Sequence, residues 1–113
     1  GRHWRYWQVL QRWPLQAPLL ADPRPLLQAW GGADALMPAA AYQRFADAAR
    51  RRVAPFCALR FASADHELRA PGADRLQQLW RWLDQAAARL EPRPGATIPL
   101  QDCAAWQAEA AQP

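Results

Sequence analysis

The chain has 113 residues, of which 51% are hydrophobic and 21% are charged. This length fits one small domain and excludes a second full one. The net charge of +4 comes from 14 basic residues that are all arginine, and they are scattered rather than gathered in a basic block, so nucleic-acid binding is not expected. No run of about 18 apolar residues predicts a spanning helix, and the first residues lack the apolar core of a signal peptide.

The cysteine count bears on compartment and cofactors. Cys57 and Cys103 are too few for a disulfide framework and lack the spacing of metal ligands. The sequence therefore predicts that neither cysteine needs a function and that no metal or cofactor is bound. A reducing, cytoplasmic location is the resulting expectation, with peripheral association at a membrane surface as an extension of it.

The first part of the chain, residues 1–24, combines aromatic and proline-rich stretches. Aromatic and aliphatic side chains in residues 2–13 keep mainly one-face spacing, which predicts a short Trp-rich helix. Four prolines in residues 14–25 indicate an extended or turn-forming linker. The Trp-rich helix has two interpretations, a piece of protein core and a lipid-contacting surface.

The central part, residues 25–90, alternates strand and helix patterns. A short apolar run at 26–30, closed by two glycines, predicts a buried strand, and residues 56–61 predict a second one. Between them, residues 38–53 carry apolar side chains at helical spacing, with Tyr42 on the apolar stripe.

A further amphipathic helix is predicted up to Leu90, with Asp74 as its N-cap. Its predicted apolar stripe comprises Leu76, Leu79, Trp80, Leu83, Ala87 and Leu90. Trp82 lies off this stripe and is expected to contact structure that is missing from this sequence. Residues 91–113 form a Pro- and Ala-rich tail with a weak helical signal near 104–111.

The order strand, helix, strand, helix predicts two adjacent parallel strands joined by a right-handed crossover. Ligands of open α/β sheets bind at the carboxyl ends of the strands, where the first strand leads to Asp34 and the second to His66. Neighbouring strands lie about 4.8 Å apart, so the carboxylate can accept the Nδ1 proton of the imidazole and leave Nε2 as a general base. Both residues also have structural interpretations: Asp34 can bond its own turn, and His66 can be a locally satisfied histidine.

These segments resemble the α/β-hydrolase family. Residues 25–38 are similar to the segment in which a proline-led strand reaches a Gly-x-x-Asp turn, and residues 59–68 resemble the last core strand with its histidine. His66-Glu67 followed by an amphipathic helix is most similar to the lysophospholipase and monoacylglycerol lipase branch. The resemblance covers about residues 22–90. It implies the C-terminal strand-helix-strand-helix portion of an α/β-hydrolase fold, preceded by a Trp-rich helix at the end of the lid region.

The resemblance also implies ester hydrolysis by a Ser-His-Asp triad, with Asp34 and His66 as the catalytic acid and base. The nucleophile is missing, because no Gly-x-Ser-x-Gly motif occurs and the only serine, Ser63, lacks the flanking glycines. A carboxylic ester hydrolase is therefore expected only when this chain combines with an N-terminal hydrolase part, or a partner chain, that carries the nucleophile. The implied substrate is an acyl-ester lipid. Arg69 stands where the branch often has an acidic residue, which leaves the subclass open.

The small size of the predicted sheet gives independent support for a partner. Parallel sheets are usually buried on both faces, so a sheet of two strands would leave edges and apolar helix faces exposed. The alternative function is a non-enzymatic interaction module with an exposed aromatic surface, in which the aspartate and histidine are accidental.

Overall fold

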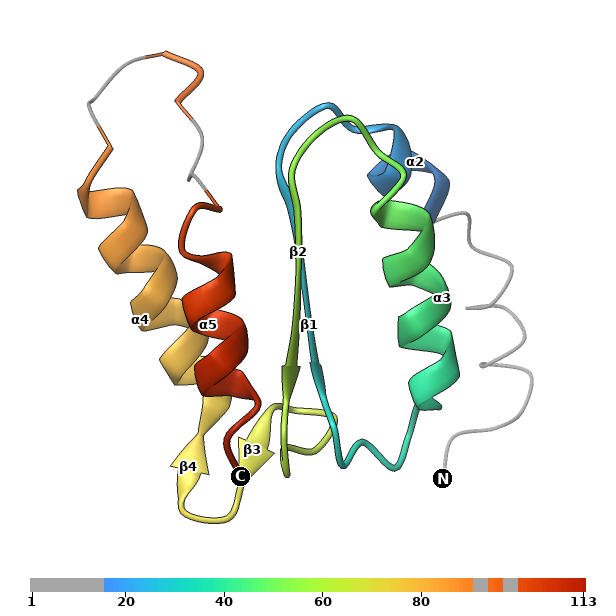
Figure 1. The fold of residues 1–113 in the computed structure, drawn as a ribbon. Coiled ribbons are helices and arrows are strands. Elements are labelled where there is room, and N and C mark those ends of the chain that lie inside the picture. Colours follow the sequence, from blue (N-terminus) through green and yellow to red (C-terminus); the bar gives the residue numbers. More distant parts are fainter. Residues whose placement is uncertain (1–15, 91–93, 97–99) are drawn as a thin grey trace.

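The computed structural model describes residues 16–90, 94–96 and 100–113 (Figure 1). The predicted Trp-rich helix over residues 2–13 lies outside the described residues. The elements in chain order are α2 (Gln16–Ala21), β1 (Leu26–Gly31), α3 (Ala39–Ala49), β2 (Phe56–Phe61), β3 (Arg69–Ala70), β4 (Ala73–Asp74), α4 (Arg75–Ala88) and α5 (Cys103–Ala110). The fold is mixed α/β, with one parallel pair of strands and one short antiparallel pair in the described part.

The strands β1 and β2 run parallel, from Leu26 opposite Phe56 to Gly31 opposite Phe61. Figure 1 shows α3 on one face of this pair and α4 with α5 on the other. The helix between two parallel strands agrees with the predicted crossover. Both strand ranges also agree with their predictions, because each is a short apolar run ended by small residues.

The segment before β1 differs from its prediction. Residues 16–21 form the short helix α2, where the prolines predict an extended or turn-forming linker. Pro18 lies in the first turn of this helix, where a backbone N–H has no intrahelical acceptor to lose. Proline is therefore compatible with a helix here, and among the described residues only 22–25 remain of the predicted linker.

Side chains alternate between the two faces of the sheet. Cys57, Leu59 and Phe61 are fully buried and pack with residues of α4 and α5 in the main core. The aromatic rings there form a stack: Phe61 lies 5.8 Å from Trp82, and Trp82 lies 5.9 Å from Trp106, between ring centroids. On the opposite face, Trp30 of β1 is buried and its ring stacks on Tyr42 of α3.

The helix α4 buries a different face from the predicted one. Its buried residues are Arg75, Leu79, Trp82 and Ala86, whereas Trp80 is 58% exposed and Leu76 is 42% exposed. The prediction that Trp82 lies off the core face is wrong because its indole completes the aromatic stack. The predicted apolar stripe also does not include Arg75, which is buried. The Arg75 guanidinium lies over the Phe61 ring and donates to Gln78 Oε1 and the Gln112 carbonyl.

The start of α4 agrees with its prediction. The Asp74 carboxylate accepts a hydrogen bond from the Gln77 amide at 3.0 Å, which is the expected geometry of an N-cap. No helix among the described residues is long and apolar enough to cross a membrane.

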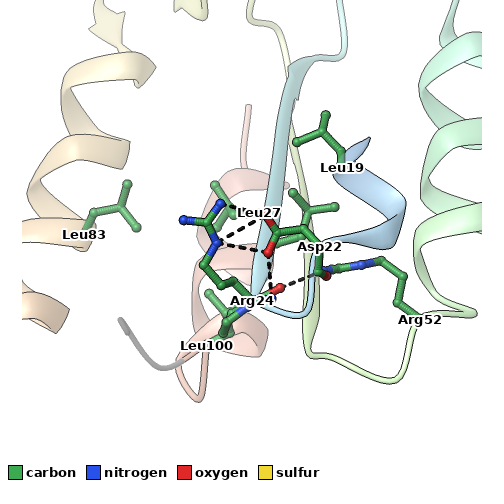
Figure 2. A pocket seen from close by; sticks show the side chains of 9 residues that line it. Leu19, Asp22, Arg24, Leu27, Arg52, Leu83 and Leu100 are labelled. Atoms are coloured by element: carbon green, nitrogen blue, oxygen red, sulfur yellow. Dashed lines mark hydrogen bonds and ion pairs between the residues drawn. The ribbon is translucent and has the colours of Figure 1, made fainter. Parts of the chain in front are cut away.

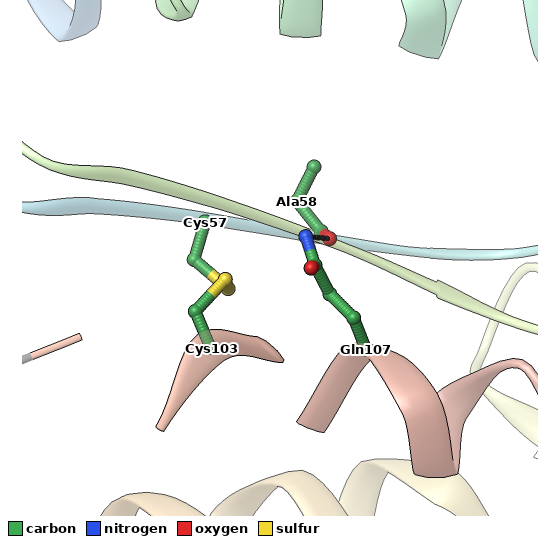
Figure 3. Close-up of a disulfide and its surroundings, with 4 residues drawn as sticks. All are labelled: Cys57, Ala58, Cys103 and Gln107. Atoms are coloured by element: carbon green, nitrogen blue, oxygen red, sulfur yellow. Dashed lines mark hydrogen bonds between the residues drawn. A yellow bond between two sulfur atoms is a disulfide. The ribbon is translucent and has the colours of Figure 1, made fainter. Parts of the chain in front are cut away.

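The two cysteines form a disulfide between β2 and α5, with the Cα atoms of Cys57 and Cys103 5.9 Å apart (Figure 3). The prediction that neither cysteine needs a function is therefore wrong, and the cysteine count no longer supports a reducing compartment. The spacing argument missed the bond because 46 residues separate the partners in sequence. Only the packing of α5 against β2 brings them together.

Further hydrogen bonds fix α5 along the outer edge of β2. Gln107 Nε2 donates to the Ala58 carbonyl at 3.1 Å (Figure 3), and the Ala62 amide donates to the Ala110 carbonyl at 2.8 Å. Both backbone groups point away from β1. α5 therefore lies on one face of the sheet and occupies two backbone groups at the outer edge of β2, those of Ala58 and Ala62.

Removing the disulfide should weaken the whole fold. We expect Cys103→Ser to lower the free energy of unfolding by about 3–4 kcal/mol, because the cross-link restricts a long loop in the unfolded chain. Urea unfolding of the variant and the wild type measures the difference. Reduced wild type is the control and should match the variant. A wild-type midpoint that reductant does not change would contradict the bond.

The two tryptophans of α4 should differ sharply in their effect on stability. We expect Trp82→Ala to cost about 3–5 kcal/mol, because it removes the centre of the aromatic stack. Trp80→Ala should change the free energy of unfolding by less than about 0.5 kcal/mol, as exposed positions do. Equal losses for both variants in urea unfolding would show that the buried face is assigned wrongly.

Candidate functional site

The carboxylate of Asp34 is fixed in the turn that follows β1. The turn closes with a hydrogen bond from the Asp34 amide to the Gly31 carbonyl at 3.1 Å. Asp34 Oδ1 accepts from the amides of Leu36 and Met37, at 2.7 and 3.0 Å. The side chain is only 2% exposed. The structural interpretation of Asp34 as a turn residue is thus confirmed, and it leaves the second carboxylate oxygen, Oδ2, for other partners.

The loop after β2 presents His66. Asp65 Oδ1 accepts from the amides of Glu67 and Arg69, each at 2.9 Å, so Asp65 caps the loop on which His66 lies. Leu68 adopts φ of 62° and is buried at 8% exposure, which anchors the far side of the loop. His66 itself is directed outward, with 45% of its side chain exposed.

The two loops touch at Gly31, and only glycine fits there. A Cβ atom at this position would lie 2.2 Å from the Asp65 carbonyl oxygen and 2.3 Å from that of Ala64. The Ala33 amide donates to the same Ala64 oxygen at 2.9 Å. Backbone contact therefore sets the distance between the turn that carries Asp34 and the loop that carries His66.

Asp34 and His66 meet as the sequence predicts. The distance from His66 Nδ1 to Asp34 Oδ2 is 2.8 Å. Within the described part of the chain, Nδ1 is the ring nitrogen of His66 that makes a hydrogen bond, and none is formed by Nε2. Asp34 and His66 are therefore brought together by the adjacency of β1 and β2.

A third side chain, which the sequence does not predict as part of the site, contacts the Asp34–His66 pair. Tyr42, in the first turn of α3, donates its hydroxyl to Asp34 Oδ2 at 2.6 Å. The sequence places Tyr42 on an apolar stripe and therefore treats it as core. The missed signal is the hydroxyl itself, because a partly buried tyrosine OH usually has a partner and Asp34 precedes the same helix.

The environment settles the protonation of Asp34 and Tyr42. Burial disfavours the charged carboxylate, but the hydrogen bonds from Tyr42, His66 and the two turn amides outweigh it and lower the pKa of Asp34 to about 2. Burial and the adjacent carboxylate raise the pKa of Tyr42 to about 12. At neutral pH the phenol therefore donates and the carboxylate accepts. In a neutral His66 the Nδ1 proton faces Asp34, which leaves the Nε2 lone pair free to take a proton.

A shallow depression of about 270 Å³ adjoins His66, lined by Ala33, Ala35, Leu36, Asp65, His66 and Glu67. A larger cavity of about 370 Å³ lies at the other end of β1 (Figure 2). Leucines dominate its wall, and its polar groups bond one another: Arg24 pairs with Asp22 at 2.6 Å, and Arg52 donates to the Arg24 carbonyl. It contains no histidine or nucleophile, so the depression beside His66 is the better candidate for chemistry.

Two other chemical possibilities find no support in the described residues. No three His, Cys, Asp or Glu side chains gather there to hold a metal ion. Ser63 lies in an exposed turn after β2 with φ of 63°, and no hydrogen bond between described residues joins it to His66. The dyad therefore has no nucleophile partner in this part of the chain.

No protein-family model matches this chain, and neither a curated protein nor a solved structure matches it. Support for a function comes from the geometry of the site.

The low pKa of Asp34 should make stability depend on pH in acid. Because the folded carboxyl holds its proton more weakly than the unfolded one, whose ordinary pKa is 3.8, protonation favours unfolding. We expect the contribution of Asp34 to be complete above about pH 4 and to be lost as pH falls toward 2. Urea unfolding across this range should show a steeper fall for wild type than for Asp34→Asn. Asp47→Asn, which removes an exposed carboxyl of α3, is the control, and parallel curves for Asp34→Asn and wild type would contradict the assignment.

Proposed function

We propose that this chain supplies the aspartate and histidine of a Ser-His-Asp triad in a carboxylic ester hydrolase. The nucleophilic serine would lie on polypeptide outside these 113 residues. The observation that carries the proposal is the 2.8 Å contact between His66 Nδ1 and Asp34 Oδ2 at the carboxyl ends of two adjacent parallel strands. That edge of an open α/β sheet is where ligands bind.

The geometry suits a histidine that moves a proton through Nε2. As the serine oxygen attacks the ester carbonyl, Nε2 would take the hydroxyl proton and later return it to the departing alkoxide. Asp34 is ionised and its Oδ1 is held by two amides, so it would fix the Nδ1–H tautomer and stabilise the imidazolium. Water would then repeat the same proton transfers to release the acid.

The two edges of the sheet indicate where the nucleophile-bearing part would dock. α5 occupies two backbone groups at the outer edge of β2, whereas β1 pairs only with β2 in the described part of the chain. By the alternation of a parallel strand, Leu27 and Ala29 direct their backbone groups to the open edge of β1. The leucine-lined cavity lies along the same strand and includes Leu26 and Leu27. A parallel strand of the partner placed on this edge would cover both features and end beside the turn that carries Asp34.

Apolar side chains beside the dyad favour an acyl-ester lipid as substrate. Leu36 lines the depression at His66 and is 67% exposed, and Met37, next in the chain, is 39% exposed. Such side chains give an acyl chain an apolar surface close to the reacting carbonyl. The resemblance to the lysophospholipase and monoacylglycerol lipase branch points to the same class.

A second candidate function is supported by another surface. Leu76 and Trp80 are exposed on one face of α4, away from the buried face that contains Trp82. An exposed tryptophan and leucine on adjacent turns are typical of a protein contact. In that case the chain would be a non-enzymatic interaction module.

A co-purification and labelling experiment separates the two functions. Intact mass of the native sample should show this chain with a larger polypeptide that reacts with a serine-directed fluorophosphonate probe. In that complex His66→Ala should lower hydrolysis of a short-chain p-nitrophenyl ester by about a thousandfold or more, with assembly retained. His3→Ala, which removes the other histidine, is the matched control. Unchanged turnover in His66→Ala would exclude the proposed role, and a single species that neither labels nor hydrolyses would favour the interaction module.

A further inference from the structure

We infer that Tyr42 is a positioning residue for the dyad, which fixes the orientation and the ionised state of Asp34; this inference rests on the proposed function. The supporting observation is that Tyr42 and His66 both bond the same carboxylate oxygen of Asp34. Asp34 Oδ2 lies 2.6 Å from the Tyr42 hydroxyl and 2.8 Å from His66 Nδ1. The same carboxylate oxygen that orients the histidine is thus itself oriented by a tyrosine on another element.

The Tyr42 hydroxyl is held in place by contacts that do not involve Asp34. Its ring stacks on Trp30, with centroids 4.8 Å apart and planes inclined by 13°, and Trp30 is only 5% exposed. Gln28 Nε2 donates to the Tyr42 backbone carbonyl at 3.1 Å. Both contacts come from β1, the strand that delivers Asp34, so tyrosine and carboxylate are fixed on one rigid unit.

Together these donors leave Asp34 one orientation. Oδ1 accepts from two turn amides and Oδ2 accepts from Tyr42, so rotation of the carboxylate would break bonds at both oxygens. The remaining acceptor direction of Oδ2 faces His66. A carboxylate that is 2% exposed also needs donors to stay charged, and Tyr42 supplies the donor that belongs neither to the turn of Asp34 nor to the histidine that Asp34 orients.

The inference assigns Tyr42 a role distinct from packing. Packing depends on the ring and its stack on Trp30, whereas positioning depends on the hydroxyl alone. Tyr42→Phe therefore separates the two roles, because phenylalanine keeps the stack and removes the donor. The matched control is Ser63→Ala, which removes another hydroxyl close to the end of β2 but makes no contact with Asp34 among the described hydrogen bonds.

Two measurements test the inference. In the full chain, a carboxyl-detected NMR titration of Tyr42→Phe should show the pKa of Asp34 rising from about 2 toward its ordinary value of 3.8, whereas Ser63→Ala should keep the wild-type value. In the co-purified hydrolase, kcat for the p-nitrophenyl ester should fall about tenfold in Tyr42→Phe, the effect of one lost hydrogen bond, with KM unchanged.

The outcomes distinguish this inference from the proposed function. In Tyr42→Phe, a raised pKa of Asp34 together with a lower kcat supports the positioning role. An unchanged pKa of Asp34 in Tyr42→Phe overturns the positioning role, whatever the turnover. A raised pKa with wild-type kcat also overturns it. Absence of ester hydrolysis in the wild-type complex overturns the proposed function, and with it the role of Tyr42 in catalysis. That result is recognised because wild type and Tyr42→Phe would then be equally inactive.

Discussion

The contact between the backbone at Gly31 and the carbonyls of Ala64 and Asp65 is the constraint on which the site depends. Side-by-side strands alone leave their following loops free to diverge by several ångströms. Here a missing Cβ lets the loop after β2 rest directly on the end of β1, and the Ala33 amide closes the contact. The short distance between Asp34 and His66 is therefore a consequence of main-chain packing. Side chains 32 residues apart in sequence are held together by backbone contact between the end of β1 and the loop after β2.

Sequence periodicity predicts the features that depend on a single helix or strand. β1, β2, most of α3 and the N-cap of α4 follow from apolar runs, helical spacing and a capping aspartate, although the helix predicted over 38–53 ends at Ala49 and leaves Val53 exposed. The Asp34–His66 contact follows from placing two such strands side by side. The buried face of α4 does not follow, because Trp80 and Trp82 are equally apolar and only the rings of Phe61 and Trp106 select Trp82. The disulfide is missed for the same reason, since nothing local to Cys57 or Cys103 indicates the partner. Tyr42 is missed because a stripe pattern records the ring and ignores the hydroxyl.

The two outer edges of the parallel sheet differ in how far their backbone groups are bonded. An uncovered strand edge exposes unpaired backbone groups and invites further pairing. α5 removes this exposure at β2 by a covalent bond and two hydrogen bonds, through Cys103, Gln107 and Ala110. No described element does the same for β1, although β1 carries apolar residues and borders a leucine-lined cavity. In the described part of the chain the two edges of the sheet therefore differ, and the edge of β1 is the one at which the proposed nucleophile-bearing part would extend the sheet.

The ionisation of Asp34 links this architecture to chemistry. A carboxylate buried beside a histidine would ordinarily lose charge, and a neutral acid cannot stabilise an imidazolium. Four donors from three segments prevent this: two turn amides, the Tyr42 hydroxyl and His66 Nδ1. Only one of them, His66, needs to change its proton count in general-base chemistry, so the other three can remain in place while the proton moves. The carboxylate is therefore preorganised by fixed donors, and the proposed proton transfer would take place at Nε2, the ring nitrogen that makes no hydrogen bond with the described residues.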